Sequence, residues 1–301
     1  MKTRYEEIVE VGAIGKENTK KMNDILALAS EENLKPATKN DENVLVLAID
    51  MQNDFMENGE LGVPGSFGDV ENFTRFIYNN MDSISRIAVS IDTHQPHQIF
   101  HPAWWIDEDG NHPAPFTIIT TADLDSGKYK AVIEPIKSRE YVENLEKVAK
   151  KPLCIWTYHC LEGTHGAALE SQFSNMVYFH SVAKKSVTQR LVKGQDPFSE
   201  MYGIIKPEYD PKGYVNIDFL NALEKFDKII IGGEAKSHCV LESVRQILEF
   251  YEDRPEITSK IYILEDCMSP IPGFEDATEQ TFLNFKQQYK INIVKSTDLT
   301  L

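Results

Sequence analysis

The chain contains 301 residues, of which 42% are hydrophobic and 26% are charged, so it can bury a substantial core. Its 47 acidic residues outnumber its 31 basic ones, and the net charge of −16 argues against a nucleic-acid or anionic-membrane partner. We expect a cytoplasmic protein for three reasons. The opening residues are charged, and no apolar stretch approaches the roughly 20 residues of a membrane span. Four cysteines are too few for a disulfide framework in a chain of this length.

Residues 1–42 are expected to form a helical arm and a linker. Apolar residues recur at helical spacing within residues 20–32, and a polar stretch follows Pro36. No chemical motif occurs in this segment, so we expect it to pack on the main domain or on a neighbouring subunit.

Residues 43–301 alternate between apolar runs and amphipathic segments, as the chain of an α/β domain does. The predicted strands are residues 44–49, 87–92, 153–156, 188–192, 229–231, 261–265 and 291–294. The predicted helices are residues 70–81, 139–150, 217–226 and 276–289, with further helices opened by residues 163–166 and by Ser237. This order predicts a doubly wound, mainly parallel β-sheet flanked by helices, in which residues 106–150 are an insertion.

A cysteine follows one of these strands at a position suited to a nucleophile. Gly232 and Gly233 end the strand, and Ser237 can cap a helix whose first turn contains Cys239. Backbone N–H groups and the helix dipole at that position favour a thiolate over a thiol. On this stretch alone, a small buried apolar cysteine is an equally good interpretation.

Two further reactive side chains come at the ends of predicted strands. Asp50 follows residues 44–49, and Lys193 follows residues 188–192. Because the carboxyl ends of parallel strands meet at one edge of a sheet, both can converge on Cys239. A carboxylate, an ammonium and a thiol can together perform acyl transfer, with the thiolate as nucleophile. By spacing alone, Asp50 is equally well interpreted as a structural cap.

Several short motifs occur around these residues. They are Ala48 to Phe55, Gly62 to Gly65, Asp92 to His94, Trp156 to Cys160, Lys193-Gly194 and Gly233 to Val240. In this order they resemble the nicotinamidase branch of the isochorismatase-like cysteine hydrolases, over residues 43–296. The resemblance implies an enzyme that hydrolyses linear amide C–N bonds, with Cys239 as nucleophile, Asp50 as its base and Lys193 as the third catalytic residue.

The same resemblance implies an oxyanion hole and an aromatic wall. Backbone N–H groups of Ala235 and Cys239 would form the oxyanion hole, beside a non-proline cis peptide between Glu234 and Ala235. The wall around a flat substrate ring would consist of Phe55, Trp156 and Tyr202. Aromatic residues are more often plain core, and this alternative stays open for the wall.

The resemblance also implies a divalent metal, zinc in the first instance, with iron or manganese as alternatives. The implied ligands are Asp92, His94 and His159. The metal would bind the ring nitrogen of the substrate and orient its amide. Many relatives have a further histidine where Gln98 stands here, which leaves His97, His101 or a smaller ligand set to complete the site.

The leading hypothesis is a metal-dependent amidase that converts nicotinamide to nicotinate and ammonia through a thioester. The same machinery with another small amide or an N-carbamoyl compound is an alternative, as are an isochorismatase-type reaction and a non-catalytic small-molecule binding protein. A homo-oligomer is expected, with no nucleic-acid or membrane partner.

Overall fold

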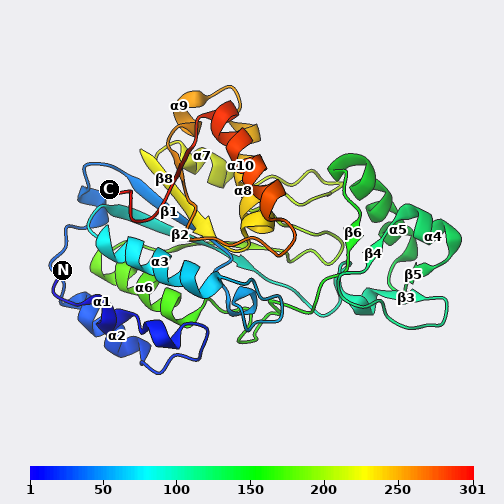
Figure 1. Ribbon diagram of the computed structural model, residues 1–301, viewed down its shortest axis with the longest axis horizontal. Coiled ribbons are helices and arrows are strands. Elements are labelled where there is room, and N and C mark those ends of the chain that lie inside the picture. Colours follow the sequence, from blue (N-terminus) through cyan, green and yellow to red (C-terminus); the bar gives the residue numbers. More distant parts are fainter.

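The structure is a computed structural model that describes residues 1–301, and a six-stranded β-sheet lies at its centre (Figure 1). Its strands are β1 (Val44–Ile49), β2 (Ile84–Asp92), β7 (Gln189–Lys193), β8 (Lys228–Gly233), β9 (Ile261–Leu264) and β10 (Asn292–Val294). They are ordered β10-β9-β8-β1-β2-β7, and every neighbouring pair is parallel. The predicted doubly wound α/β sheet is therefore confirmed.

The central strand β1 is the apolar run that the sequence predicted to be buried on both faces. All of its residues are buried, because β2 and β8 flank it and helices cover both faces of the sheet. The strand registers place Ile49 beside Gly233 and Asp92 beside Lys193. The carboxyl ends of β1, β2, β7 and β8 therefore meet at one edge, where an α/β fold builds its site.

Helices cover the two faces of the sheet in separate layers (Figure 1). One layer contains α3 (Ser66–Asn79) and α6 (Ser171–Ala183), and the other contains α7 (Ile217–Leu223), α8 (Leu241–Phe250), α9 (Pro255–Thr258) and α10 (Glu275–Tyr289). The two layers enclose apolar cores of nearly equal size, 27 and 26 buried residues, so the sheet is sandwiched on both sides. No helix has the length and the hydropathy that crossing a membrane requires.

The N-terminal arm packs on its own domain. Its helices α1 (Tyr5–Ile8) and α2 (Met22–Ser30) lie against α6, and Ile8 is buried in the core that α3 and α6 share. The hydroxyl groups of Tyr5 and Thr74 form a hydrogen bond of 2.8 Å. The arm was expected to pack on the main domain or on a neighbouring subunit, and in the structure it packs on the main domain.

Residues 106–150 form most of a lobe that projects from one end of the molecule (Figure 1). The elements of the lobe are β3 (Trp105–Asp107), β4 (Ile118–Ile119), α4 (Thr121–Ser126), β5 (Tyr129–Ala131), α5 (Pro135–Asn144) and β6 (Leu153–Cys154). The short strand predicted at residues 153–156 is present as β6, which ends at Cys154 and pairs with β4 in a separate two-stranded sheet rather than with the main sheet. The lobe has its own apolar core, which extends to Trp156.

The helix predicted to open at residues 163–166 begins later, at Ser171. The preceding loop is held to the segment after β1 instead, since Asn53 Nδ2 donates to the carbonyl of His165 at 2.8 Å. The backbone N–H of Asp54 donates to the carbonyl of Gly166 at 3.1 Å. These bonds satisfy backbone groups outside a helix, which the apolar spacing alone did not reveal.

Candidate active site

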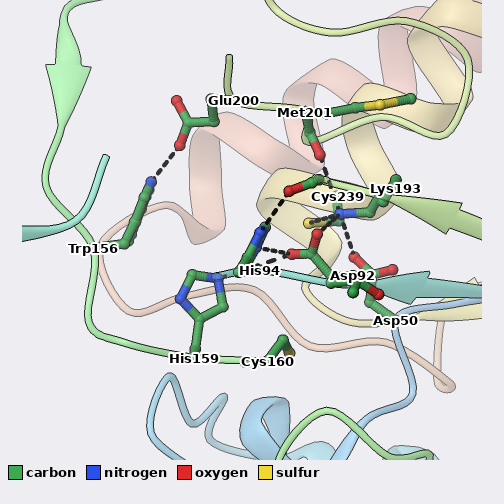
Figure 2. Close-up of polar contacts among 12 residues, drawn as sticks. Asp50, Asp92, His94, Trp156, His159, Cys160, Lys193, Glu200, Met201 and Cys239 are labelled. Carbon is green, nitrogen blue, oxygen red and sulfur yellow. Dashed lines mark hydrogen bonds and ion pairs between the residues drawn. The ribbon is translucent and has the colours of Figure 1, made fainter. Parts of the chain in front are cut away.

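Three reactive side chains from separate strand ends meet in one place (Figure 2). Asp50 directly follows β1, Lys193 is the last residue of β7, and Cys239 lies in a wide π-helical turn after β8. The Nζ atom of Lys193 lies 2.9 Å from Oδ2 of Asp50 and 3.8 Å from Sγ of Cys239. The structure therefore brings together the three residues that the sequence singled out for acyl transfer.

All three residues are buried, and Cys239, with 7% of its surface exposed, is the most accessible of them. Removal from water therefore affects the pKa of each side chain. Burial raises the pKa of Asp50, and the Lys193 ammonium lowers it only in part, so Asp50 is a stronger base than an exposed aspartate. Burial lowers the pKa of Lys193, but Asp50 and Asp92 hold it well above its usual value. The lysine is therefore a permanent cation beside the thiol.

The cysteine rests as a thiol. Burial raises the pKa of Cys239 well above its ordinary value, and the opposing effect of Lys193 is smaller. The helix N-terminus was expected to favour a thiolate, but removal from water outweighs the helix dipole here. A base must take the proton, and Asp50 is the carboxylate next to it.

Asp50 is held by Ser90, which lies on the neighbouring strand β2. The Ser90 hydroxyl donates to Oδ1 of Asp50 and accepts from its backbone N–H at 2.8 Å. The backbone of Asp50 has a φ of 45°, a left-handed conformation that is uncommon outside glycine. With Oδ1 engaged by Ser90, Oδ2 is the oxygen that faces Lys193.

The turn before the cysteine presents a free backbone donor. The peptide between Glu234 and Ala235 is cis, as the resemblance implied, and the N–H of Ala235 donates no hydrogen bond within the protein. Ala235 and Cys239 line the same pocket. A free, oriented N–H beside a nucleophile is the geometry that stabilises a developing oxyanion.

Ser237 does not cap the helix as predicted. The residue that precedes the π-helical turn is Ala235, which has no capping side chain. The Ser237 hydroxyl instead accepts from the backbone N–H of Ile271 at 3.0 Å and bonds Nδ1 of His238 at 2.8 Å. This hydroxyl therefore ties the turn to the loop around Ile271, which also lines the pocket.

Asp92, His94 and His159 form a buried cluster suited to a metal, with ligand atoms all within 4.8 Å of one another. Nε2 of His94 lies 2.9 Å from Oδ2 of Asp92, and Nε2 of His159 lies 3.8 Å from the same oxygen. The other ring nitrogens bond backbone carbonyls, those of Gly194 at 3.0 Å and Thr157 at 2.8 Å. These outer bonds direct the Nε2 atoms towards the carboxylate, as around a bound metal.

The charge states and the space around this cluster also fit a divalent cation. Burial lowers the pKa of His159 to about 3, which keeps the imidazole in its neutral, ligating form. Burial acts to raise the pKa of Asp92, but His94 and Lys193 hold it well below its usual range, so it is ionised. A Cβ atom at Gly194 would lie 2.4 Å from Cε1 of His94, so glycine is needed beside the cluster.

The structure separates the candidates for a further ligand. Gln98 is committed elsewhere, because its Nε2 donates to the carbonyl of Gly194 at 2.9 Å and its Oε1 accepts from the N–H of Gln95 at 2.8 Å. His97 is exposed. His101 is fully buried, and its Nε2 has no partner. Its ring centre lies 5.9 Å from that of His94, so His101 is the histidine of this loop with a free nitrogen beside the cluster.

The three aromatic residues expected in a substrate wall all line one pocket with Cys239 and the metal cluster. Phe55 packs edge-on against His159, with ring centres 5.7 Å apart. Trp156 and Tyr202 are perpendicular, with centres 6.2 Å apart, and the indole N–H donates to the tyrosine hydroxyl at 3.1 Å. Ten of the fifteen lining residues are hydrophobic, so the pocket suits a flat, largely apolar group.

Two polar pocket residues were missed by the sequence reasoning, along with several apolar ones. His238 lines the pocket together with Cys239, although adjacent residues of a regular helix point in different directions. Its ring packs edge-on against Trp156 at 5.8 Å. Glu200 also lines the pocket, and nothing in its local sequence distinguishes it from a surface acid.

No protein-family model and no curated protein sequence matches this chain. Solved structures do match its fold. The yeast nicotinamidase bound to nicotinaldehyde has a TM-score of 0.59 at 18% identity, and the match covers 84% of this chain and 99% of that one. The nicotinamidase/pyrazinamidase of Acinetobacter baumanii has a TM-score of 0.58 at 18% identity, with 86% and 99% covered. The L. infantum protein in complex with nicotinate gives 0.54 at 14% identity, with 89% and 98% covered.

Proposed function

We propose that this chain, whose fold is that of the nicotinamidases, is a metal-dependent cysteine amidohydrolase that converts nicotinamide to nicotinate and ammonia. One observation carries the proposal: Asp50, Lys193 and Cys239 are in contact, and Cys239 opens into the pocket that also contains Asp92, His94 and His159. The three matched proteins described above support the choice of reaction by their fold.

The acylation step begins with the transfer of the Cys239 thiol proton to Asp50. The resulting thiolate is stabilised by Lys193 and attacks the amide carbon, whose C=O electron pair moves onto oxygen. The N–H of Ala235 donates to that oxyanion. When the tetrahedral adduct collapses, Asp50 returns the proton to the nitrogen and the C–N bond breaks, which releases ammonia and leaves an acyl thioester on Cys239.

The deacylation step uses the same residues. Asp50 takes a proton from a water molecule, which attacks the thioester carbon. The C–S bond then breaks, the acid product forms, and the sulfur of Cys239 recovers a proton from Asp50. Lys193 remains charged throughout, because its pKa stays far above neutrality.

The metal is proposed to be zinc, with iron or manganese as alternatives, held by Asp92, His94 and His159 with His101 next to them. When bound, it would supply a Lewis acid for the ring nitrogen of the substrate. A pyrazinamidase of Pyrococcus horikoshii in complex with zinc matches this fold with a TM-score of 0.50 and supports that choice. Phe55 and Trp156 would then hold the two faces of the ring.

A homo-oligomeric state and a cytoplasmic location complete the proposal. The four cysteines are all free in the structure, which suits a reducing compartment. Neither the subunit count nor the compartment affects the chemistry above.

A substrate panel tests the assignment. Purified protein loaded with zinc is assayed for ammonia release from pyridine carboxamides and from N-carbamoyl compounds, with and without a chelator. We expect nicotinamide to be among the fastest substrates and chelation to abolish the activity. Turnover of carbamoyl compounds alone would move the protein to the alternative substrate class, and full activity after complete removal of metal would contradict the proposed metal dependence.

A further inference from the structure

A buried acid, Glu200, lines the pocket next to Trp156 (Figure 2). It is 4% exposed and belongs to the loop that follows β7. The indole N–H of Trp156 donates to its Oε1 and also to the hydroxyl of Tyr202 at 3.1 Å. A carboxyl group inside the protein thus fixes the orientation of an indole ring that faces the pocket.

The lobe formed by the insertion reaches this acid through one hydroxyl. The backbone N–H of Glu200 donates to Oη of Tyr141, which is buried on α5, at 2.9 Å. The lobe also contacts Trp156 directly, because the ring of Phe116 packs edge-on against the indole with ring centres 5.9 Å apart. Tyr141 and Trp156 also belong to the same apolar core of the lobe.

We propose that Glu200 is a positioning residue that orients Trp156 in the pocket, and that the insertion determines substrate fit by holding Glu200 through Tyr141. The catalytic part of this inference rests on the proposed function. The structural part, which links Tyr141, Glu200 and Trp156, does not.

The contacts of Glu200 decide what its loss would change. Its side chain makes no hydrogen bond or ion pair with Asp50, Lys193 or Cys239. The carbonyl of the next residue, Met201, accepts from Nζ of Lys193 at 3.1 Å, and a side-chain change at residue 200 retains that backbone bond. Without the Glu200 carboxyl, the indole N–H keeps only the neutral hydroxyl of Tyr202, which is a weaker acceptor than an ionised carboxylate. The ring would then occupy a wider range of orientations, and a substrate ring would bind less well.

The electrostatic surroundings make this link observable. Burial raises the pKa of Glu200 to about 7, with the Tyr202 hydroxyl and Lys151 acting to lower it and Glu208 acting to raise it. Glu208 is itself paired with Lys151. The acceptor of the indole hydrogen bond therefore changes charge near neutral pH, and the indole proton of Trp156 should report that change.

The first readout is the indole ¹⁵N–¹H spectrum of the full-length protein, in which Trp156→Phe assigns the signal. We expect the Trp156 signal to shift with pH around a midpoint near 7, to lose that shift in Glu200→Gln and to move in Tyr141→Phe. Tyr129→Phe is the matched control, because Tyr129 also lies in the lobe but its hydroxyl makes no hydrogen bond to the loop of Glu200. This readout does not depend on any enzymatic activity.

The second readout is steady-state kinetics with nicotinamide. Loss of one buried hydrogen bond is worth about 1 kcal/mol, so Glu200→Ala and Tyr141→Phe should raise KM by about fivefold while kcat stays within about twofold. Glu200→Gln, which keeps an acceptor oxygen, should recover most of the loss, and Tyr129→Phe should match the native protein.

The two proposals fail in different ways. A native protein that does not hydrolyse nicotinamide would overturn the substrate assignment, while the spectrum would still decide the link from Tyr141 to Trp156. A Trp156 signal that keeps its pH-dependent shift in Glu200→Gln and keeps its native position in Tyr141→Phe would overturn the positioning role. If Glu200→Ala does not fold, these two conservative variants carry the same decision.

Discussion

Lys193 and Asp50 form an ion pair of 2.9 Å, although they come from β7 and β1, two strands that are separated in the sheet by β2. The pair is buried, and the same ammonium lies 3.2 Å from Oδ1 of Asp92 at the end of β2. The Lys193 ammonium thus pairs with the carboxylates of both Asp50 and Asp92. It therefore connects the acyl-transfer residues to the proposed metal cluster.

Lys193→Met should therefore impair both stability and activity. Its loss leaves Asp50 buried without a counter-charge and leaves Asp92 paired with His94 alone, which typically costs about 3 kcal/mol in unfolding free energy. The pKa of Asp50 should rise further, so the base is protonated at neutral pH and cannot accept the thiol proton. Urea unfolding and ammonia release measure the two effects.

The matched control for that variant is Lys184→Met, because Lys184 is also fully buried but lies next to Asp82, away from the pocket. It should lose stability and retain activity. Equal activity losses in the two variants would show that Lys193 matters only for folding.

Gly194 should be required for the metal cluster. An added Cβ would lie 2.4 Å from Cε1 of His94 and 2.5 Å from Oδ1 of Asp92. Gly194→Ala should lower zinc affinity by at least about tenfold, as displacement of supporting groups typically does. Competition with a chromogenic chelator measures this without any assay of turnover.

Gly213→Ala is the control for backbone strain. Gly213 has a φ of +66°, close to the +76° of Gly194, but no atom lies within 4 Å of an added Cβ. Both variants should lose roughly 1 kcal/mol of stability, because alanine is disfavoured in the left-handed conformation. Only the change at residue 194 should lower the affinity for zinc. Unchanged zinc affinity in Gly194→Ala would place the metal elsewhere.

His101 should contribute to zinc binding, whereas His97 should not. His101 is buried with a free Nε2 beside the cluster, and His97 is exposed. His101→Ala should weaken zinc by about tenfold or more, and His97→Ala should bind as the native protein does. Isothermal titration of zinc into metal-free protein measures both affinities. Native zinc affinity in His101→Ala as well as in His97→Ala would restrict the site to Asp92, His94 and His159.

Asp69 gives the stability of the protein a defined pH dependence. Burial raises its pKa to about 6, and its Oδ2 has no hydrogen-bond partner among the donors of the protein. Well below pH 4, Asp69 is protonated in both the folded and the unfolded state. As the pH rises from about 4 to 6, the unfolded state loses this proton first, so stability falls.

Asp69→Asn removes that titration. The unfolding free energy of Asp69→Asn minus that of the native protein should therefore increase by on the order of 2 kcal/mol between pH 4 and pH 7, so the variant becomes the relatively more stable protein. Urea titrations at several pH values measure the difference. A difference that stays constant across this range would contradict the raised pKa.

The sheet and the convergence of the three reactive residues could be predicted because both are encoded locally. A continuous apolar run such as β1 has to be buried on both faces, and side chains that follow parallel strands must share one edge. Motifs around Asp50, Lys193 and Cys239 then supplied what spacing alone left open. The predicted cis peptide before Ala235 came from the resemblance and is present in the structure.

What the sequence did not reveal depends on contacts between distant segments. Glu200 becomes a pocket residue only because Tyr141 and Trp156 reach it from the lobe. His238 lines the pocket because the chain forms a wide π-helical turn there, which apolar periodicity does not indicate. The charge state of Cys239 follows from its burial, and burial is a property of the whole fold.

The most direct measurement is ammonia release from nicotinamide by zinc-loaded native protein, by Cys239→Ala and by Cys160→Ala. Cys160 is buried and has no role in the acyl-transfer group, so it controls for the loss of a cysteine. Release should fall by at least about a thousandfold in Cys239→Ala, because the covalent route is lost, and remain near the native rate in Cys160→Ala. Equal rates from the native protein and Cys239→Ala would contradict the account.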